Sequence, residues 1–186
     1  MALFQTLTPE AEPVTLANAK QTLRLDHDSE DELLSGLIRA AREEVEASCG
    51  LALIEQGWRL TLDRVPRSGR VVLRRHPVRA VTAVTVYGAD GEASLADPGT
   101  YRLDAHGRPA RLHFSSQPSA PNGIEIDFVA GFGEAGTDVP DLIKRAMLAL
   151  VAHWYEFRAV YSAGDQPVSF PPGYERLLAP WRERRL

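Results

Sequence analysis

Apolar residues recur at helical spacing in two stretches of the chain, one in each half. The first stretch predicts a helix from Glu30 to about Ser48, and Gly50 is well placed to end it. A shorter helix, capped by Thr15 and ending near Leu25, is expected just before it. The apolar positions of the longer helix form one stripe: Leu33, Leu34, Leu37, Ile38, Ala41 and Val45. Such a stripe needs a packing partner, because isolated helices are marginal in water.

The second helical stretch begins at Asp138, with Pro140 in the first turn, where proline is tolerated. Its stripe extends over some 20 residues, or ~30 Å, and comprises Leu142, Ile143, Ala146, Met147, Leu150, Val151, Trp154 and Tyr155. A short helix is expected at residues 174–179. A helix that is apolar on most sides is usually central in a bundle or shared between subunits.

Between these helices the period of the apolar residues changes from 3.6 to 2. The alternation is clearest from Trp58 to Leu62. Further strands are predicted at residues 71–73, 81–87, 101–103, 112–114 and 124–128. Prolines fall between these runs, where a missing N–H does no harm, and Asp90-Gly91 supplies a hairpin turn. We therefore expect about six short antiparallel strands.

This order of elements predicts an α+β fold, in which the N- and C-terminal helices form a small bundle with an inserted antiparallel β-rich module. The helical bundle is discontinuous and comprises residues 13–50 and 137–180, because the two stripes need each other to be buried. The inserted β-module comprises residues 53–130. Residues 1–12 are expected to be a flexible N-terminal tail, and residues 181–186 a C-terminal partner-binding tail.

Composition narrows the class of protein. The chain has 186 residues, of which 44% are hydrophobic and 25% charged, and this is ordinary for a globular protein. The longest strongly apolar stretch, residues 146–152, is far shorter than the ~20 residues that span a bilayer. Cys49 is the only cysteine, which excludes an internal disulfide and a cysteine-based zinc site. We expect a soluble protein made in a reducing compartment, with no membrane partner.

Charge is segregated along the chain, although the formal net charge is only −4. Residues 26–46 carry eight acidic residues and two arginines, whereas residues 55–80 carry seven arginines and two acidic residues. The Arg42–Glu46 pair is expected on the polar side of the first long helix. Such regions can guide electrostatic association, and a solvated surface is the simpler interpretation of each.

No pattern of titratable residues predicts catalysis. Residues 131–136 match GxGxxG, but the preceding strands are antiparallel, and Glu134 and Asp138 would repel a phosphate. Plain turn chemistry explains these glycines better. No two of the five histidines have i,i+4 spacing, and Cys49 lies at a helix C-terminus, where the dipole disfavours a thiolate. We expect no enzymatic activity, no catalytic residue, no cofactor and no metal ligand.

The arginines of residues 55–80 allow two interpretations. They would suit contacts to a phosphate backbone, which would make the chain a DNA-binding accessory protein. They also suit ordinary exposed loops, because interleaved aromatic residues and a recognition helix are both missing. Near the C-terminus, Trp181 lies among arginines, the residue types that dominate interface hot spots, although a terminus folded back on the protein would look the same.

A series of short segments is distributed along residues 13–182. The N-terminal members are Pro13-Val14-Thr15-Leu16-Ala17-Asn18-Ala19-Lys20, residues 40–46 and Cys49-Gly50-Leu51-Ala52-Leu53-Ile54. The C-terminal members are residues 128–133, Val151-Ala152-His153-Trp154-Tyr155-Glu156 and residues 174–182. Their ordered series resembles the head–tail connector, or adaptor, proteins of long-tailed phages. The finer likeness is to the adaptor of bacterial gene transfer agents, which are phage-like particles.

The resemblance implies a structural protein of the neck of a virion or phage-like particle, assembled in the bacterial cytoplasm. It implies a ring, usually of twelve copies, beneath the portal protein at the capsid vertex. The ring would join the portal to a stopper or tail-side neck protein and leave a channel through which DNA passes without sequence recognition. The resemblance also implies no enzymatic activity, no cofactor and a helical bundle with a β-rich insertion.

Two groups of residues become candidates through this resemblance. The first contains the expected portal contacts of the C-terminal tail: Trp181, Arg182, Arg184, Arg185 and Leu186. The second contains candidates from the arginine-rich module: Arg67, Arg70, Arg74 and Arg75. These four arginines would either meet the acidic helical region of a neighbouring copy in the ring or line the channel near DNA.

Overall fold

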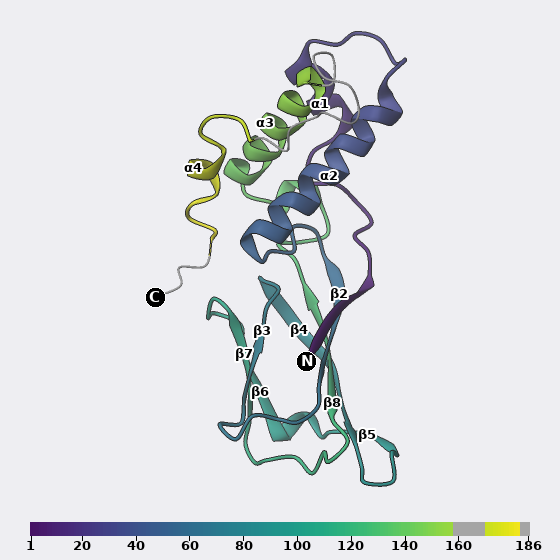
Figure 1. Ribbon diagram of the computed structural model, residues 1–186, viewed down its shortest axis with the longest axis vertical. Coiled ribbons are helices and arrows are strands. Elements are labelled where there is room, and N and C mark those ends of the chain that lie inside the picture. Colours follow the sequence, from purple (N-terminus) through teal and green to yellow (C-terminus); the bar gives the residue numbers. More distant parts are fainter. Residues whose placement is uncertain (158–169, 183–186) are drawn as a thin grey trace. The chain divides into compact units, whose positions relative to one another are not determined.

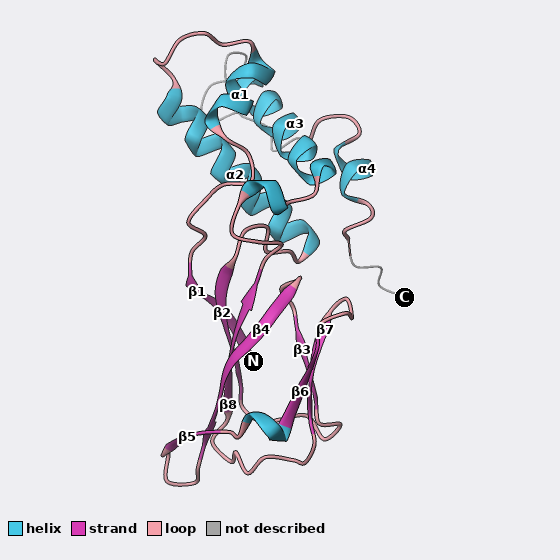
Figure 2. Ribbon diagram, turned by 180° about the vertical axis from the view of Figure 1, so that it is seen from behind, coloured by secondary structure: helices cyan, strands magenta, loops and turns pink. Residues whose placement is uncertain are grey.

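The computed structural model describes residues 1–157 and 170–182. The chain divides into two compact units. The β-unit comprises Met1–Glu10 and Glu55–Phe132, and the helical unit comprises Ala11–Ile54 and Gly133–Leu186. Figures 1 and 2 show all the strands in the first unit and the long helices in the second, so the predicted α+β class is confirmed. Among the described residues, no helix has the length and apolar character needed to cross a membrane.

The described residues of the helical unit form four α-helices: α1 (Leu16–Leu23), α2 (Asp31–Cys49), α3 (Asp141–Phe157) and α4 (Tyr174–Leu178). Helices α2 and α3 pack along each other, α1 contacts both, and α4 packs on α3 (Figure 1). The two predicted stripes supply the core: Leu34, Ile38, Ala41, Val45, Ile143, Ala146, Met147, Leu150 and Val151. Two stripe members, Leu33 and Leu142, are exposed instead.

The helix ends follow local sequence signals. Thr15 caps α1 as predicted, because its Oγ1 accepts a hydrogen bond from the N–H of Asn18 at 3.1 Å. Gly50 ends α2 at φ +66°, a conformation that costs glycine little. Helix α3 begins later than expected, because Asp138 belongs to a separate 3₁₀ turn, Gly136–Asp138.

The prediction that Arg42 and Glu46 lie on a polar helix face is wrong, because both side chains are buried. Arg42 donates to Glu12 at 2.9 Å and to Glu46 at 3.0 Å, and Glu46 accepts from the backbone N–H of Leu53 at 2.8 Å. Burial disfavours the charge of Arg42, yet the two carboxylates raise its pKa above the ordinary value. The pair therefore fastens the segments before and after α2 to this helix.

Eight strands form two antiparallel sheets in the β-unit. The five-stranded sheet has the order β1 (Ala2–Leu7), β2 (Gln56–Leu62), β8 (Ile124–Ala130), β4 (Val78–Tyr87) and β5 (Ala93–Leu95). The three-stranded sheet has the order β3 (Arg70–Leu73), β7 (Ala110–Phe114) and β6 (Tyr101–Asp104). The six predicted strands are all present, and β1 and β5 are additional.

The prediction of a flexible tail at residues 1–12 is wrong for β1, which pairs with β2 from Ala2 opposite Thr61 to Leu7 opposite Gly57. The register shifts at Thr6, where a bulge interrupts the pairing. A Cβ on Gly57 would lie 2.8 Å from Thr6 Oγ1, so only glycine leaves room for this bulge. An edge strand that buries few side chains shows no alternation of apolar and polar residues, and for this reason the sequence of β1 predicted a tail.

Alternate residues of both sheets are buried. The five-stranded sheet buries Trp58, Leu60, Leu62, Val84, Ile124, Ile126 and Phe128, and the three-stranded sheet buries Val71, Leu73, Ala110 and Leu112. The two sheets lie beside each other in both views (Figures 1 and 2). Each sheet therefore has one face in the core of the β-unit and one outer face, and the outer faces carry the charged residues.

Candidate interaction surfaces

The outer face of the five-stranded sheet carries a compensated charge cluster. Arg59 on β2 makes a bidentate contact with Asp127 on β8, through Nε–Oδ1 at 2.6 Å and a second N–H···Oδ2 bond at 2.8 Å. Its Nη1 lies 3.3 Å from Glu125 Oε2. The hydrogen bonds that Arg59 donates to Asp127 raise the pKa of Arg59 above its ordinary value. This arginine is therefore already satisfied within its own sheet.

Two more of the seven arginines are engaged within the β-unit. Arg79 Nε lies 3.1 Å from Glu55 Oε2. The guanidinium of Arg75 lies 4.6 Å from the ring centroid of Trp58, in a cation–π contact. These contacts weaken the interpretation of the whole stretch as a DNA-binding surface, because Arg59, Arg75 and Arg79 serve the fold.

The remaining arginines of the stretch, Arg64, Arg67, Arg70 and Arg74, are exposed. Strand register places Arg70 opposite His113 on β7, and His113 opposite Arg102 on β6. Arg111 lies on the same outer face, two residues from His113. We call Arg70, Arg102 and Arg111 the basic face. Ion pairs are absent from these three side chains within residues 1–157 and 170–182.

Sequence analysis missed two members of the basic face, Arg102 and Arg111. The available signal was the alternation itself, because inward-facing Leu112 and Leu103 place their neighbours on the outer side. It was overlooked because these arginines lie outside the conspicuous stretch at residues 55–80. The structure thus brings together one predicted candidate, Arg70, and two arginines from later strands.

The described part of the C-terminal tail lies against the helical unit. Arg182 forms an ion pair with Glu175 and is 35% exposed, and the N–H of Trp181 donates to the carbonyl of Leu178 at 2.8 Å. Burial raises the pKa of the nearby Cys49 thiol, against the opposing influence of Ser48 and Arg182, so Cys49 is a poor nucleophile. The other tail candidates, Arg184, Arg185 and Leu186, lie outside the described residues.

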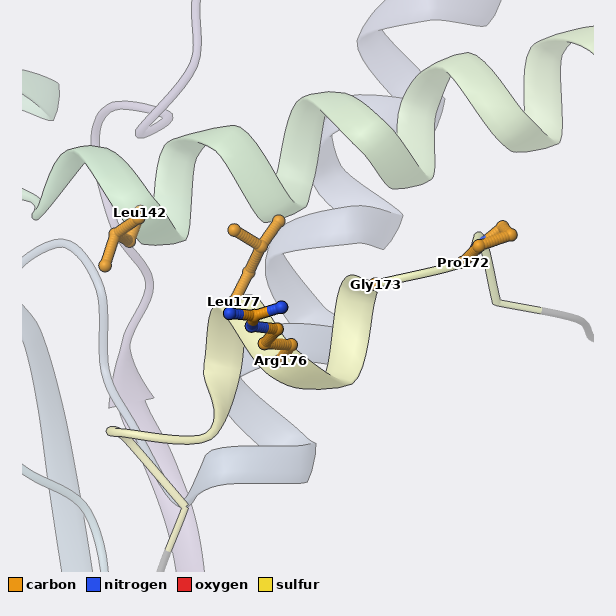
Figure 3. A pocket seen from close by; sticks show the side chains of 5 residues that line it. All are labelled: Leu142, Pro172, Gly173, Arg176 and Leu177. Atoms are coloured by element: carbon orange, nitrogen blue, oxygen red, sulfur yellow. The ribbon is translucent and has the colours of Figure 1, made fainter.

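A pocket of about 470 Å³ opens between α3 and the segment that contains α4 (Figure 3). Its lining consists of Leu142, Pro172, Gly173, Arg176 and Leu177. Leu142 is 49% exposed, although its periodicity assigned it to the buried stripe. The pocket therefore presents apolar side chains beside one cation, a combination suited to a protein segment rather than to catalysis.

The acidic region of α1 and α2 is partly neutralised. Lys20 Nζ lies 2.5 Å from Asp28 and 2.6 Å from Asp31, and the hydrogen bond to Asp28 raises the pKa of Lys20. Asp26, Glu32 and Glu43 are exposed, and Glu43 Oε1 lies 3.6 Å from Arg42 Nη2. We call these three residues the acidic patch.

The glycine-rich segment does not form a nucleotide site. A Cβ on Gly133 would lie 2.1 Å from Asp138 Oδ2, so a carboxylate fills the space beside this turn. A phosphate would be repelled there. No group of three or more histidine, cysteine or acidic side chains in the described parts of the chain is arranged to hold a metal ion.

Comparison with known proteins identifies a family of structural proteins of phage-like particles. The sequence profile of the family named Head completion protein matches residues 13–173. The chain belongs to this family. The predicted likeness to head–tail connectors of the gene transfer agent type is thereby confirmed. Comparison with curated protein sequences gives no significant match.

Solved structures similar to this head completion family member come from gene transfer agent particles. A chain in the neck of an empty particle, computed with C6 symmetry, has a TM-score of 0.85 and 29% identity, covering 100% of this chain and 97% of that one. A chain in the virion of a native particle gives a TM-score of 0.85 and 28% identity over the same shares. A chain in the neck of a native particle, computed with C12 symmetry, gives 0.81 and 28%, again over 100% and 97%.

Proposed function

We propose that this chain is a structural head–tail connector that forms a ring beneath the portal protein. The ring would join the capsid vertex to a stopper or tail-side neck protein and leave a channel for DNA, without catalysing a reaction. The observation that carries this proposal is the likeness to gene transfer agent neck chains over both units of the molecule. The particle would be assembled in the bacterial cytoplasm, and DNA would pass without sequence recognition.

The proposed ring contains twelve copies, in keeping with the C12 symmetry used for one similar neck structure. A cyclic ring needs a heterologous interface, in which one surface of a copy meets a different surface of the next. The exposed side chains of Arg67, Arg70 and Arg74 suit the acidic patch of a neighbour. Arg75 is a weaker candidate, because its guanidinium already stacks on Trp58.

The C-terminal segment is the proposed portal contact, through Trp181, Arg182, Arg184, Arg185 and Leu186. Two features of the helical unit support this assignment. The apolar pocket beside Leu142 and Arg176 offers a second surface close to the segment. The Arg182–Glu175 ion pair lies at the surface, so a carboxylate from a partner can replace Glu175 at small cost.

Electron microscopy and light scattering of the chain, alone and mixed with the portal encoded in the same gene cluster, test this function. We expect a ring of about twelve copies on the portal. Deleting residues 181–186 should abolish portal binding, whereas the R39A/R145A variant, which removes two exposed arginines of α2 and α3, should bind normally. A full-length chain that stays monomeric and ignores the portal would contradict the proposal.

A further inference from the structure

The two sheets of the β-unit have four open edges, which differ in charge. The edges of the three-stranded sheet are β3, which carries Arg70, and β6, which carries Arg102 and Asp104. The edges of the five-stranded sheet are β1 and β5, and neither strand contains a charged residue, a proline or a glycine. Proteins commonly protect open edges with such residues, because unpaired backbone groups invite another strand. Neither end of the five-stranded sheet carries a charged residue or a proline, and the protection present there is the bulge at Thr6 in β1 and the three-residue length of β5.

These two edge strands also expose apolar side chains. All three residues of β5 and five of the six residues of β1 are exposed. Leu95 on β5 is 74% exposed and Phe4 on β1 is 46% exposed. Each of the two edges therefore exposes a large apolar side chain that a strand added beside it would cover.

Strand register places these apolar residues on the same face. One row across the sheet runs from Ala2 through Thr61, Glu125 and Thr85 to Leu95. Phe4 lies two residues along β1 from Ala2, and thus on the same side. If β5 of one copy lay beside β1 of another, Leu95 would come next to Ala2 and Phe4.

We propose that the five-stranded sheet continues from one copy of this chain to the next, with β1 of one copy paired to β5 of its neighbour. This inference rests on the proposed ring and names a contact within it. The occupant of each edge is a second copy, because the two uncharged edges and their apolar residues complement each other. The C12 symmetry of a similar neck structure supports repeated copies side by side.

The topology fits such a head-to-tail contact. All four pairings in the sheet are antiparallel, so β1 and β5, at its two ends, run in the same direction. A sheet that continues into the next copy therefore pairs β1 with β5 in parallel. The contact is heterologous, and repeated rotation closes it into a ring.

The spacing of strands predicts the size of this ring. Five strands at ~4.8 Å occupy ~24 Å, so twelve copies give a circumference of roughly 290 Å and a diameter of about 90 Å at the level of the sheets. Electron micrographs of the ring measure this diameter directly.

Cysteine crosslinking on the portal-bound protein, and on the chain alone at high concentration, tests the pairing. Cys49 is buried and is replaced by alanine, so that introduced cysteines react alone. With a short bismaleimide, the F4C/L95C variant should give a ladder of dimers, trimers and larger species, because each copy offers both ends. The matched control is V72C/L95C, which moves one cysteine to an exposed position on the three-stranded sheet.

The outcomes separate the pairing from the connector function. Rings on the portal without F4C/L95C crosslinks would overturn the pairing and leave the function standing. Crosslinked dimers of the F4C single variant would show that β1 pairs with β1. A ladder from V72C/L95C equal to that from F4C/L95C would show that the crosslinks arise from random collision. Either result would overturn the proposal. A ladder without portal binding would support the pairing and contradict the connector function.

A second pair of variants tests the energy of the contact. F4K/L95K adds to each edge a charge of the kind that blocks strand addition, so the protein concentration at half-assembly should rise about tenfold or more. The V72K variant should assemble as the wild type does. Circular dichroism and thermal melting confirm that both variants are folded, and unchanged assembly of folded F4K/L95K would overturn the proposal.

Discussion

The two sheets of the β-unit differ in whether the charged side chains on their outer faces are paired with each other. On the five-stranded sheet Arg59 is held by Asp127 and Glu125, and the edge strands are uncharged. On the three-stranded sheet Arg70, Arg102 and Arg111 make no ion pair among the described residues, although strand register places Asp104 opposite Arg111, and the edges are charged. Covering a face costs less desolvation free energy when its charges are already paired with each other. Arginines without such a pair attract an anionic surface and stay hydrated until they meet it. One sheet is suited to pairing at its edges, and the other to contact through its face.

The largest expected effect comes from reversing the charge of Arg70, a member of the basic face, together with that of the exposed Arg74. The R70E/R74E variant should raise the concentration needed for ring assembly by about tenfold or more at low salt, because it replaces attraction to a neighbour's acidic patch by repulsion. The effect should shrink as salt rises, since exposed charges are screened over about 8 Å at physiological ionic strength. Sedimentation velocity over a salt series measures it.

The control for R70E alone is R145E, which makes the same change of net charge at an exposed position of α3, a helix that carries no residue of the acidic patch. It should assemble normally at every salt concentration. Equal weakening by both variants would point to net charge alone. If R70E/R74E rings form normally but retain less DNA, these arginines line the channel instead.

A smaller effect, on folding, is expected at the compensated cluster. The D127A variant leaves the Arg59 donors without their bidentate partner and should cost about 2 kcal/mol in the free energy of unfolding. The R111A variant removes an arginine of the basic face and should change stability by no more than ~0.5 kcal/mol. Urea denaturation followed by circular dichroism compares them, and equal losses would remove the distinction between the two sheets.

The smallest effect concerns two adjacent arginines. Arg75 stacks on Trp58, whereas Arg74 is exposed. The R75A variant should cost about 0.5–1 kcal/mol through the lost cation–π contact, and R74A should lie within ~0.5 kcal/mol of wild type. Parallel thermal melts measure both. A larger loss from R74A than from R75A would mean that the stacking contributes nothing.

Periodicity predicts the parts of this fold that bury one face. The stripes of α2 and α3, the six predicted strands and the Thr15 cap all depend on local sequence, and each is found where the pattern indicates it. Strands β1 and β5 leave no such pattern, because almost all of their side chains are exposed. A pattern of burial cannot reveal an element that buries almost nothing.

The charged contacts are less predictable, because they depend on residues far apart in sequence. Arg59 and Asp127 are separated by 68 positions and meet only through the register of β2 and β8. Arg42 appears polar and exposed on its helix, yet Glu12, 30 positions earlier, helps to bury it. The basic face is an intermediate case, because its alternation was visible while the pairing of its strands was not.

The route of the chain between its two units has a mechanical consequence. The backbone passes from one unit to the other three times, after residues 10, 54 and 132. A tensile load between the units is therefore divided among three covalent connections in parallel. In the proposed neck, a load that pulls the two units apart would be shared by three peptide connections, where a simple two-domain chain has one.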